Sequence, residues 1–258
     1  MRVTSFYTRV HEYGQRRLSR HLGIRPIDVR LTQPIVSFTF DDFPISAFRA
    51  GGSILEEFGA TGTYYVALDL LGRRMPVGMI ASIDDLQEVV ARGHELGCHT
   101  FTHCHAWKTH PRLFEESILD NRLAFAQVMP GVPFETHSYP ISTPHPRTKL
   151  IAGKYFACCR GGGQTFNAGR VDLNRLNAFF LEKSRSDLAA VKGLIDRNKE
   201  SRGWLIFVTH DISEEPTNFG CTPEFLREVV KYSLQSGAAV LPVAKALRVL
   251  QSDRGGIR

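Results

Sequence analysis

Short apolar runs alternate with segments of helical period along most of the chain. The clearest runs cover residues 35–40 and 204–208, and their β-branched and aromatic side chains predict buried strands. Amphipathic segments such as 82–92 and 111–128 predict helices. Because strands and helices follow one another in turn, we expect parallel strands that form a barrel or a wound sheet.

The other expected elements keep the same order. We expect helices over residues 46–58, 186–199 and 223–237, a short helix that closes the chain, and strands over residues 63–67, 96–99, 136–140, 155–159, 177–181 and 238–243. The chain of 258 residues is 43% hydrophobic and contains no linker-like run, and α/β barrels of this length form one unit. We therefore expect a single catalytic domain over residues 31–258.

Positive charge is concentrated at the start of the chain. The formal net charge is +6, and residues 1–30 hold seven arginines against two acidic residues. Such an arm is suited to nucleic acid, anionic lipid or a phosphorylated substrate, or it forms a solvated helix on the body. Phe6, Val10 and Tyr13 have helical spacing, which favours a basic arm packed on the body. No base-reading module is visible, so we expect no nucleic-acid partner.

The cysteines indicate a reducing compartment. There are five, an odd number, and the sequence shows no apolar signal region near its start and no membrane-length segment. We therefore expect a cytoplasmic protein without a transmembrane segment. Cys158 and Cys159 are adjacent rather than spaced as C-x-x-C, which argues against a zinc ribbon or a redox pair.

Two carboxylates follow the first apolar run. Asp41 and Asp42 stand directly after residues 35–40, and Pro44 ends any strand ladder. Adjacent carboxylates at the mouth of a buried strand repel each other and lose hydration, so they need a cation or a catalytic use. The simpler alternative is that they cap the helix expected near Ser46.

A histidine pair forms the second candidate group. His99 and His103 have i, i+4 spacing, which on one helical turn places both imidazoles within reach of one metal. Thr100 stands where an H-E-x-x-H protease carries glutamate, which excludes that class. Two imidazoles, an aspartate oxygen and an open position suit zinc or a similar divalent ion. His105 is a competing ligand.

A further histidine, His210, follows the run 204–208. Histidines at strand ends also occur as core residues bonded to backbone. However, the two aspartates, His99 and His210 all fall at the carboxyl ends of expected strands, which is the edge where parallel α/β folds build their sites. We therefore expect these side chains to share one site.

At these residues the chain resembles the polysaccharide deacetylases, the NodB homology domain of carbohydrate esterase family four. The family's T-F-D-D motif stands at residues 39–42, its H-[ST]-x-x-H motif at residues 99–103, and its L-x-H motif resembles residues 208–210, with valine for leucine. The resemblance covers about residues 34–248. It implies a distorted (β/α) barrel of seven or eight mostly parallel strands.

The resemblance also implies a reaction. Asp42, His99 and His103 would bind one divalent metal, Zn²⁺ first, with Co²⁺, Ni²⁺ or Mn²⁺ as alternatives. Asp41 would be the general base and His210 the general acid. The activity implied is metal-dependent hydrolysis of the N-acetyl group of an amino sugar in a polysaccharide, oligosaccharide or glycan precursor.

The substrate side of the site is implied in the same way. The backbone N–H of Tyr139 would hold the oxyanion, and Pro140 and Val208 would contact the substrate. Tyr139 and Pro140 belong to a segment that departs from the family's R-x-P-Y-G motif. Residues 138–142 read S-Y-P-I-S and lack the arginine that orients the base in the family. The D-x-x-D-W motif has no clear match.

These departures leave two questions open. We expect Arg175, which enters a predicted strand, to replace the lost arginine, unless it is a surface residue; Arg160 is the other candidate. The alternative function is that of a catalytically silent homologue that binds metal or glycan.

Overall fold

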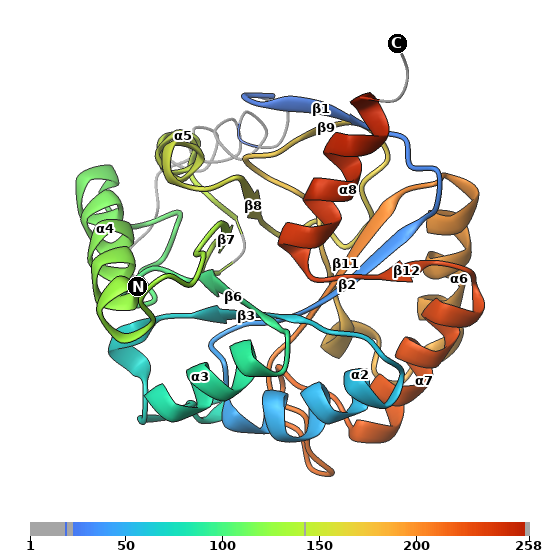
Figure 1. Ribbon diagram of the computed structural model, residues 1–258, viewed down its shortest axis with the longest axis horizontal. Helices are drawn as coiled ribbons and strands as arrows, with labels where there is room; N and C mark the ends of the chain where they lie inside the picture. Colours follow the sequence, from blue (N-terminus) through green and yellow to red (C-terminus); the bar gives the residue numbers. More distant parts are fainter. Residues whose placement is uncertain (1–18, 20–22, 142, 256–258) are drawn as a thin grey trace, which may run out of the picture.

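A curled parallel sheet forms the centre of the molecule in this computed structural model, which describes residues 19, 23–141 and 143–255 (Figure 1). Its path runs in the order β10 (Phe179–Phe180), β11 (Trp204–Thr209), β2 (Ile35–Phe40), β3 (Thr63–Val66), β6 (Glu95–Cys98), β7 (Thr136–Ser138) and β8 (Cys158–Arg160), and β12 (Ala239–Val240) also pairs with β2. All these pairings are parallel. The predicted distorted barrel of seven or eight mostly parallel strands is confirmed.

Helices surround this sheet (Figure 1). The helical elements are η1 (Ala47–Gly52), α2 (Ser53–Glu57), η2 (Leu68–Leu70), α3 (Ile83–Ala91), α4 (Pro111–Val128), α5 (Pro146–Tyr155), η3 (Leu181–Ser184), α6 (Leu188–Glu200), α7 (Pro223–Gln235) and α8 (Val243–Gly255). Among the described helices, none combines the length and the apolar character needed to cross a membrane.

The central strands are apolar because both of their faces are buried. In β11, Leu205 and Phe207 join the main core, whereas Trp204, Ile206 and Val208 pack in a second cluster with α8. Polar side chains inside these strands are satisfied locally: the Trp204 indole N–H donates to the Ser37 hydroxyl at 2.9 Å. This two-sided burial explains the continuous apolar runs in the sequence.

Two parts of the structure differ from the predicted elements. Residues 146–155, where the sequence pattern predicts no helix, form α5. This helix has proline in its first turn, and the His145 side chain accepts the N–H of Arg147. The expected helix 46–58 is divided into the π-helix η1 and α2. A Cβ on Gly51 would lie 3.0 Å from the Phe40 ring, so the chain passes the strand more closely than an ordinary helix with side chains could.

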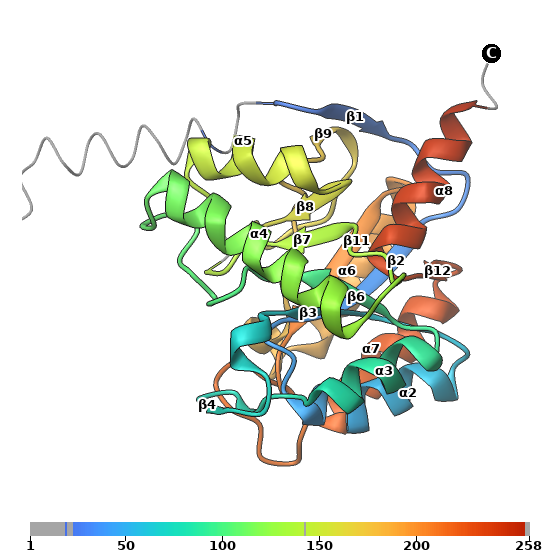
Figure 2. The ribbon, with the colours of Figure 1, turned by 60° about the vertical axis from the view of Figure 1, so that its left-hand side comes forward.

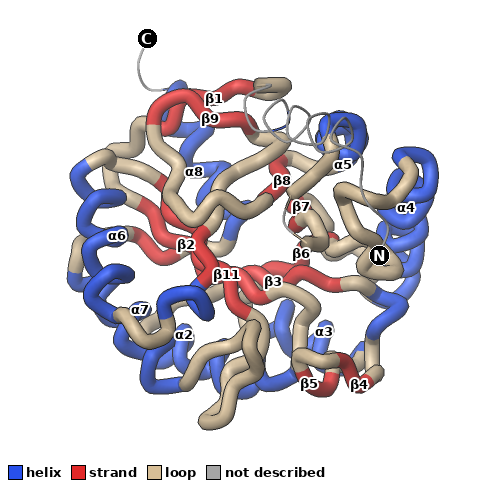
Figure 3. The backbone as a smooth tube through the Cα atoms, turned by 180° about the vertical axis from the view of Figure 1, so that it is seen from behind, coloured by secondary structure: helices blue, strands red, loops and turns tan. Residues whose placement is uncertain are grey.

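Additional short strands also escaped prediction. β1 (Pro26–Val29) and β9 (Gly169–Asp172) form an antiparallel pair (Figure 3), and β4 (Arg74–Met75) and β5 (Gly78–Met79) form a second one. β1 lies inside the segment 1–30 that we expected to be an arm. Residues 1–18 and 20–22 lie outside the described residues, so the packing of a basic arm stays a prediction.

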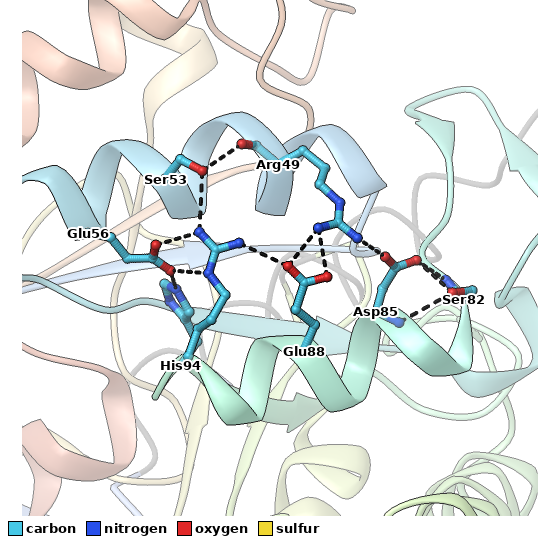
Figure 4. Close-up of polar contacts among 8 residues, drawn as sticks. Arg49, Ser53, Glu56, Ser82, Asp85, Glu88 and His94 are labelled. Carbon is cyan, nitrogen blue, oxygen red and sulfur yellow. Dashed lines mark hydrogen bonds and ion pairs between the residues drawn. The ribbon is translucent and has the colours of Figure 1, made fainter.

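A ladder of charged side chains joins η1 and α2 to α3 (Figure 4). Arg49 contacts Asp85 and Glu88, each at 2.7 Å, and Arg92 contacts Glu56 and Glu88. Ion pairs that are open to solvent contribute little individually, typically about 0–1 kcal/mol. The ladder therefore fixes the relative position of the helices more than it adds stability.

His94 is the buried end of this ladder. The Gly62 N–H donates to His94 Nδ1 at 2.9 Å, and Nε2 lies 2.8 Å from Glu56 Oε1. Because Nδ1 is an acceptor, the imidazole is neutral and its proton lies on Nε2. Burial lowers the pKa of His94, although Glu56 opposes the shift.

This arrangement predicts a pH dependence of stability. A folded-state pKa below the unfolded value means that the stabilisation is complete above the unfolded pKa of about 6.5 and is lost as the pH falls below it. Between about pH 7 and pH 5.5, the free energy of unfolding should therefore fall more for the natural protein than for His94→Gln, which cannot titrate. Urea unfolding at each pH measures this, and parallel curves for the two proteins would contradict it.

Candidate metal centre and active site

The carboxyl ends of β2, β6 and β11 meet at one cleft of about 440 Å³. All five polar side chains predicted for the chemistry line it, namely Asp41, Asp42, His99, His103 and His210. The β4–β5 hairpin and the loop that follows β11 extend on the same side of the molecule (Figure 2). The expectation that the ends of these strands share one site is confirmed.

A sharp turn of the backbone separates the two aspartates. The Asp41 N–H still donates to the Thr209 carbonyl at 3.0 Å, which continues the pairing of β2 with β11. Asp42 and Phe43 then adopt left-handed conformations with φ of 59° and 56°. Such conformations cost roughly 1–2 kcal/mol per residue and occur where a site requires them. The turn does more than cap a helix, because it separates the environments of the two carboxylates.

A loop, not a helical turn, brings His99 and His103 together, so that part of the prediction was wrong. Thr100 and His103 have φ of 60° and 53°, which no helix contains. The loop is fixed by the Thr100 hydroxyl, which accepts the Cys104 N–H at 3.1 Å, and by the Ser117 hydroxyl of α4, which accepts the Phe101 N–H at 3.0 Å. The two imidazole centroids lie 4.9 Å apart.

Asp42, His99 and His103 fit a divalent cation. The Nε2 atoms of the two histidines lie 3.5 and 3.2 Å from Asp42 Oδ1, yet this buried oxygen makes no hydrogen bond within the described part of the chain. One ligand atom from each of the three residues lies within 4.8 Å of the others. An orphaned carboxylate oxygen facing two imidazoles is the arrangement expected of a metal centre.

The surroundings of His99 support a ligand role. Its Nδ1–H donates to the Ser138 carbonyl at 2.8 Å, which leaves the lone pair of Nε2 facing Asp42. Burial lowers the pKa of His99 to about 3, so the imidazole is neutral. The competing ligand His105 lies outside this group of three, and its Nδ1 accepts the Trp107 N–H at 3.2 Å.

Asp41 is held by a buried arginine. Nη2 of Arg160 contacts both Asp41 Oδ1 and the Ser138 hydroxyl, and that hydroxyl lies 3.2 Å from Asp41 Oδ1. The Arg160 guanidinium also lies 5.0 Å from the centroid of the Tyr65 ring. Burial alone would raise the pKa of Asp41, but the charge of the Arg160 guanidinium and its hydrogen bond to the carboxylate outweigh burial and lower this pKa. Asp41 is therefore ionised at neutral pH, and its oxygens can accept a proton.

The choice of Arg175 as the base-orienting residue was wrong. Its guanidinium donates to the Gly162 carbonyl at 3.2 Å and lines a different cavity. Arg160, the second candidate, ends β8 and pairs in register with Ser138 of β7, the position at which the family motif has arginine. The positively charged guanidinium thus reaches Asp41 from β8, the strand next to the one that carries the family motif.

The substrate contacts implied for Tyr139, Pro140 and Val208 are not borne out by the geometry. The Tyr139 N–H already donates to the Arg160 carbonyl at 3.0 Å, because β7 and β8 continue their pairing there. It is therefore not available to an oxyanion. Val208 packs in the cluster under α8, and neither it nor Pro140 is among the residues that line the cleft.

His210 is oriented by the loop that follows it. Phe219 O lies 3.2 Å from His210 Nδ1 and 3.1 Å from the His210 backbone nitrogen. The Nδ1–H therefore donates to this carbonyl, which leaves Nε2 for proton transfer. Asp211 fixes the loop by accepting the Thr217 N–H at 2.8 Å.

Glu182 is a cleft residue that the sequence reading missed. Burial raises the pKa of its carboxyl to about 7, and its Oε2 is buried with no hydrogen-bond partner among the described residues. The signal was present, because Glu182 follows the expected strand 177–181 as Asp41 follows residues 35–40. It belongs to none of the family motifs that the sequence matches.

Comparison with known proteins gives one family and a set of similar folds. The family model described as "Polysaccharide deacetylase" matches residues 28–155. No curated protein matches significantly. A family 4 acetyl xylan esterase from Clostridium thermocellum in complex with a cobalt ion is 19% identical, with a TM-score of 0.60 over 84% of this chain and 92% of the other.

Two further solved structures are similar. The peptidoglycan deacetylase PdaC from Bacillus subtilis, as its D285S mutant, is 15% identical, with a TM-score of 0.55 over 87% of this chain and 95% of that one. BA3943 from Bacillus anthracis, described as a family pseudoenzyme, is 10% identical, with a TM-score of 0.57 over 84% of this chain and 66% of the other. At these identities the likeness establishes the fold, and active and inactive proteins share it.

The metal centre can be tested without any assay of activity. His103→Ala removes one of three ligand atoms, so it should abolish stoichiometric Zn²⁺ binding at micromolar protein. His105→Ala is the matched control, because His105 lies outside the group, and it should bind one equivalent. Metal content after desalting measures both. Equal metal in the two variants would mean that the ligands are assigned wrongly.

Proposed function

Since the chain belongs to the polysaccharide deacetylase family, we propose that it is a metal-dependent hydrolase that removes the N-acetyl group from an amino sugar in a polysaccharide, oligosaccharide or glycan precursor. One observation carries the proposal. A three-ligand group, Asp42 with two imidazoles, shares a cleft with a separate ionised carboxylate, Asp41, that a buried arginine holds in place.

Asp42, His99 and His103 would hold the cation. Two imidazole nitrogens and one carboxylate oxygen are ligands that suit Zn²⁺ and leave a position open, and one structural neighbour carries cobalt. A bound divalent cation supplies polarisation of the amide carbonyl and a water acidic enough for a weak carboxylate base.

Asp41 accepts the proton of the attacking water. The contacts with Arg160 and Ser138 restrict its rotamer, so little reorganisation is needed when the proton transfers. The lowered pKa keeps Asp41 ionised at neutral pH, which makes it ready to accept this proton, although it limits its strength as a base.

His210 delivers a proton to the leaving amine. Its Nδ1–H is engaged by the Phe219 carbonyl, so the proton that it donates must come from Nε2. With Asp41 and His210 both lining the cleft, the base and the acid can act on one bound amide.

A silent homologue that binds metal or glycan is the alternative, and a pseudoenzyme among the neighbours shows that the fold tolerates loss of activity. This alternative is suggested by the arginine that the third family motif lacks here. The Arg160 guanidinium pairs with the same carboxylate, Asp41, which favours an active enzyme. The cytoplasmic location expected from the cysteine pattern remains a proposal.

Amine release from N-acetylated sugars, with added Zn²⁺ or Co²⁺, tests the proposed function. Asp41→Asn should retain the metal and lose about 10²- to 10⁴-fold in turnover, because an amide cannot accept the proton of water. Asp120→Asn, on the exposed face of α4, is the matched control and should keep full activity. If the metal-loaded natural protein releases no amine from mono-, oligo- or lipid-linked N-acetylated sugars, the silent homologue is the correct interpretation.

A further inference from the structure

The cleft has a polar floor and apolar walls. The floor holds the predicted metal ligands, Asp41 and His210, whereas separate segments of the chain supply the apolar side chains of the walls: Leu70, Met75, Val77, Ile141, Phe180 and Phe219. On the side of β10, Glu182 and Lys183 are the charged exceptions. A ligand that fits this cleft must present one polar end and an apolar body.

The apolar surface extends outwards to the mouth of the cleft. Ile141 and Phe219, which both line the cleft, are 57% and 46% exposed. Single exposed apolar residues are common on proteins, but their gathering around one cleft marks a place where an apolar ligand binds.

Ile141 is held at the mouth in an unfavourable conformation. Its φ is +61°, in the left-handed region where a β-branched residue is strongly disfavoured and asparagine or glycine is usual. Strain of this kind persists at functional sites when the side chain is needed there. The position thus retains an apolar side chain at a cost in backbone energy.

The β4–β5 hairpin supplies another part of the apolar lining, and it is anchored to the segment that carries the two aspartates. The residues of the β4–β5 hairpin pack on a small core of their own that contains Leu70, Val77 and Ile80. The Ala81 N–H donates to the Phe43 carbonyl at 3.0 Å, directly after the aspartate pair. The hairpin is therefore a fixed wall at the entrance to the site.

A hydroxyl-rich polysaccharide fits such walls poorly. Each sugar hydroxyl that loses water without gaining a partner costs free energy. Phe180 and Phe219 offer rings on which one sugar could stack, but the aliphatic side chains of Met75, Val77 and Ile141 offer neither hydrogen bonds nor a flat ring. A hydrocarbon chain in the same place buries its surface against them and gains the hydrophobic contribution.

We propose that the substrate is an N-acylated amino sugar that carries a hydrocarbon chain, and that the chain lies along these apolar walls while the amide reaches Asp41. This substrate class rests on the proposed function. The hydrocarbon has two chemical sources, a lipid attached at the glycosidic oxygen or a long acyl group on the nitrogen, and they share the same recognition.

Four model substrates separate these cases when amine release is followed below the micelle-forming concentration. They are the methyl and octyl glycosides of N-acetylglucosamine, the methyl glycoside of N-octanoylglucosamine, and chitotetraose. One of the two octyl compounds should have a kcat/KM about tenfold or more above that of the methyl glycoside of N-acetylglucosamine. Even partial burial of the added methylenes accounts for a difference of this size. A preference for the octyl glycoside identifies a lipid-linked sugar, and a preference for the octanoyl amide identifies a long-chain acyl group.

Ile141→Asn should reduce this preference by about threefold or more, because the polar amide removes part of the wall and relieves the left-handed strain at the same time. Leu123→Asn is the matched control, since Leu123 is a 63% exposed leucine on α4 outside the cleft, and it should leave the preference unchanged.

Binding to the metal-free protein gives a readout that is independent of catalysis. Titration calorimetry in EDTA should show tighter binding of the preferred octyl compound than of its methyl counterpart, with a negative heat-capacity change. The proposed substrate class would be overturned if chitotetraose were hydrolysed as efficiently as either octyl compound and neither octyl compound bound to the metal-free protein. The deacetylase function would still stand. Octyl binding without amine release from any substrate would instead overturn the proposed function.

Discussion

The buried ion pair between Arg160 and Asp41 is the interaction on which the candidate site depends. Neither side chain can be left alone, because an unpaired guanidinium or carboxylate in a protein interior costs several kcal/mol, on the order of 3–5 when one partner is removed. The pair keeps Asp41 ionised and fixes it beside, but apart from, the metal-ligand group. Buried ion pairs often add little net stability, so stability alone does not explain this one. Its place at the carboxyl end of β2, beside the candidate metal ligands, points to function.

The curled sheet makes this contact possible. β8 lies four strands away from β2 along the path of the sheet, and the Arg160 guanidinium lies by the Tyr65 ring of β3 and contacts Asp41 at the end of β2. Ser138 of β7 and Arg160 of β8 are paired in register, so an arginine at either position could reach the Asp41 carboxylate. The site therefore constrains where a positive charge must lie more than which residue of the chain carries it.

The sequence allowed the parallel barrel and the chemical residues of the cleft to be predicted, because two-sided burial leaves continuous apolar runs and Asp41, Asp42, His99 and His210 follow such runs. It did not allow the arginine to be chosen, since the reach of Arg160 depends on the β7–β8 register and the curl of the sheet. The left-handed conformations of Phe43 and Thr100 could not be predicted, because bulky and β-branched residues rarely adopt them. Helix α5 was missed because histidine is an uncommon cap.

Moving the positive charge between the two paired positions tests the account most directly. Turnover of an N-acetylated sugar should fall by about tenfold or more in Arg160→Ser at full metal occupancy, because Asp41 loses the group that orients it. The double variant Ser138→Arg with Arg160→Ser should recover most of this loss, since the guanidinium then reaches Asp41 from β7. Unchanged turnover in Arg160→Ser would contradict the account, as would a double variant no more active than Arg160→Ser despite a folded, metal-loaded protein.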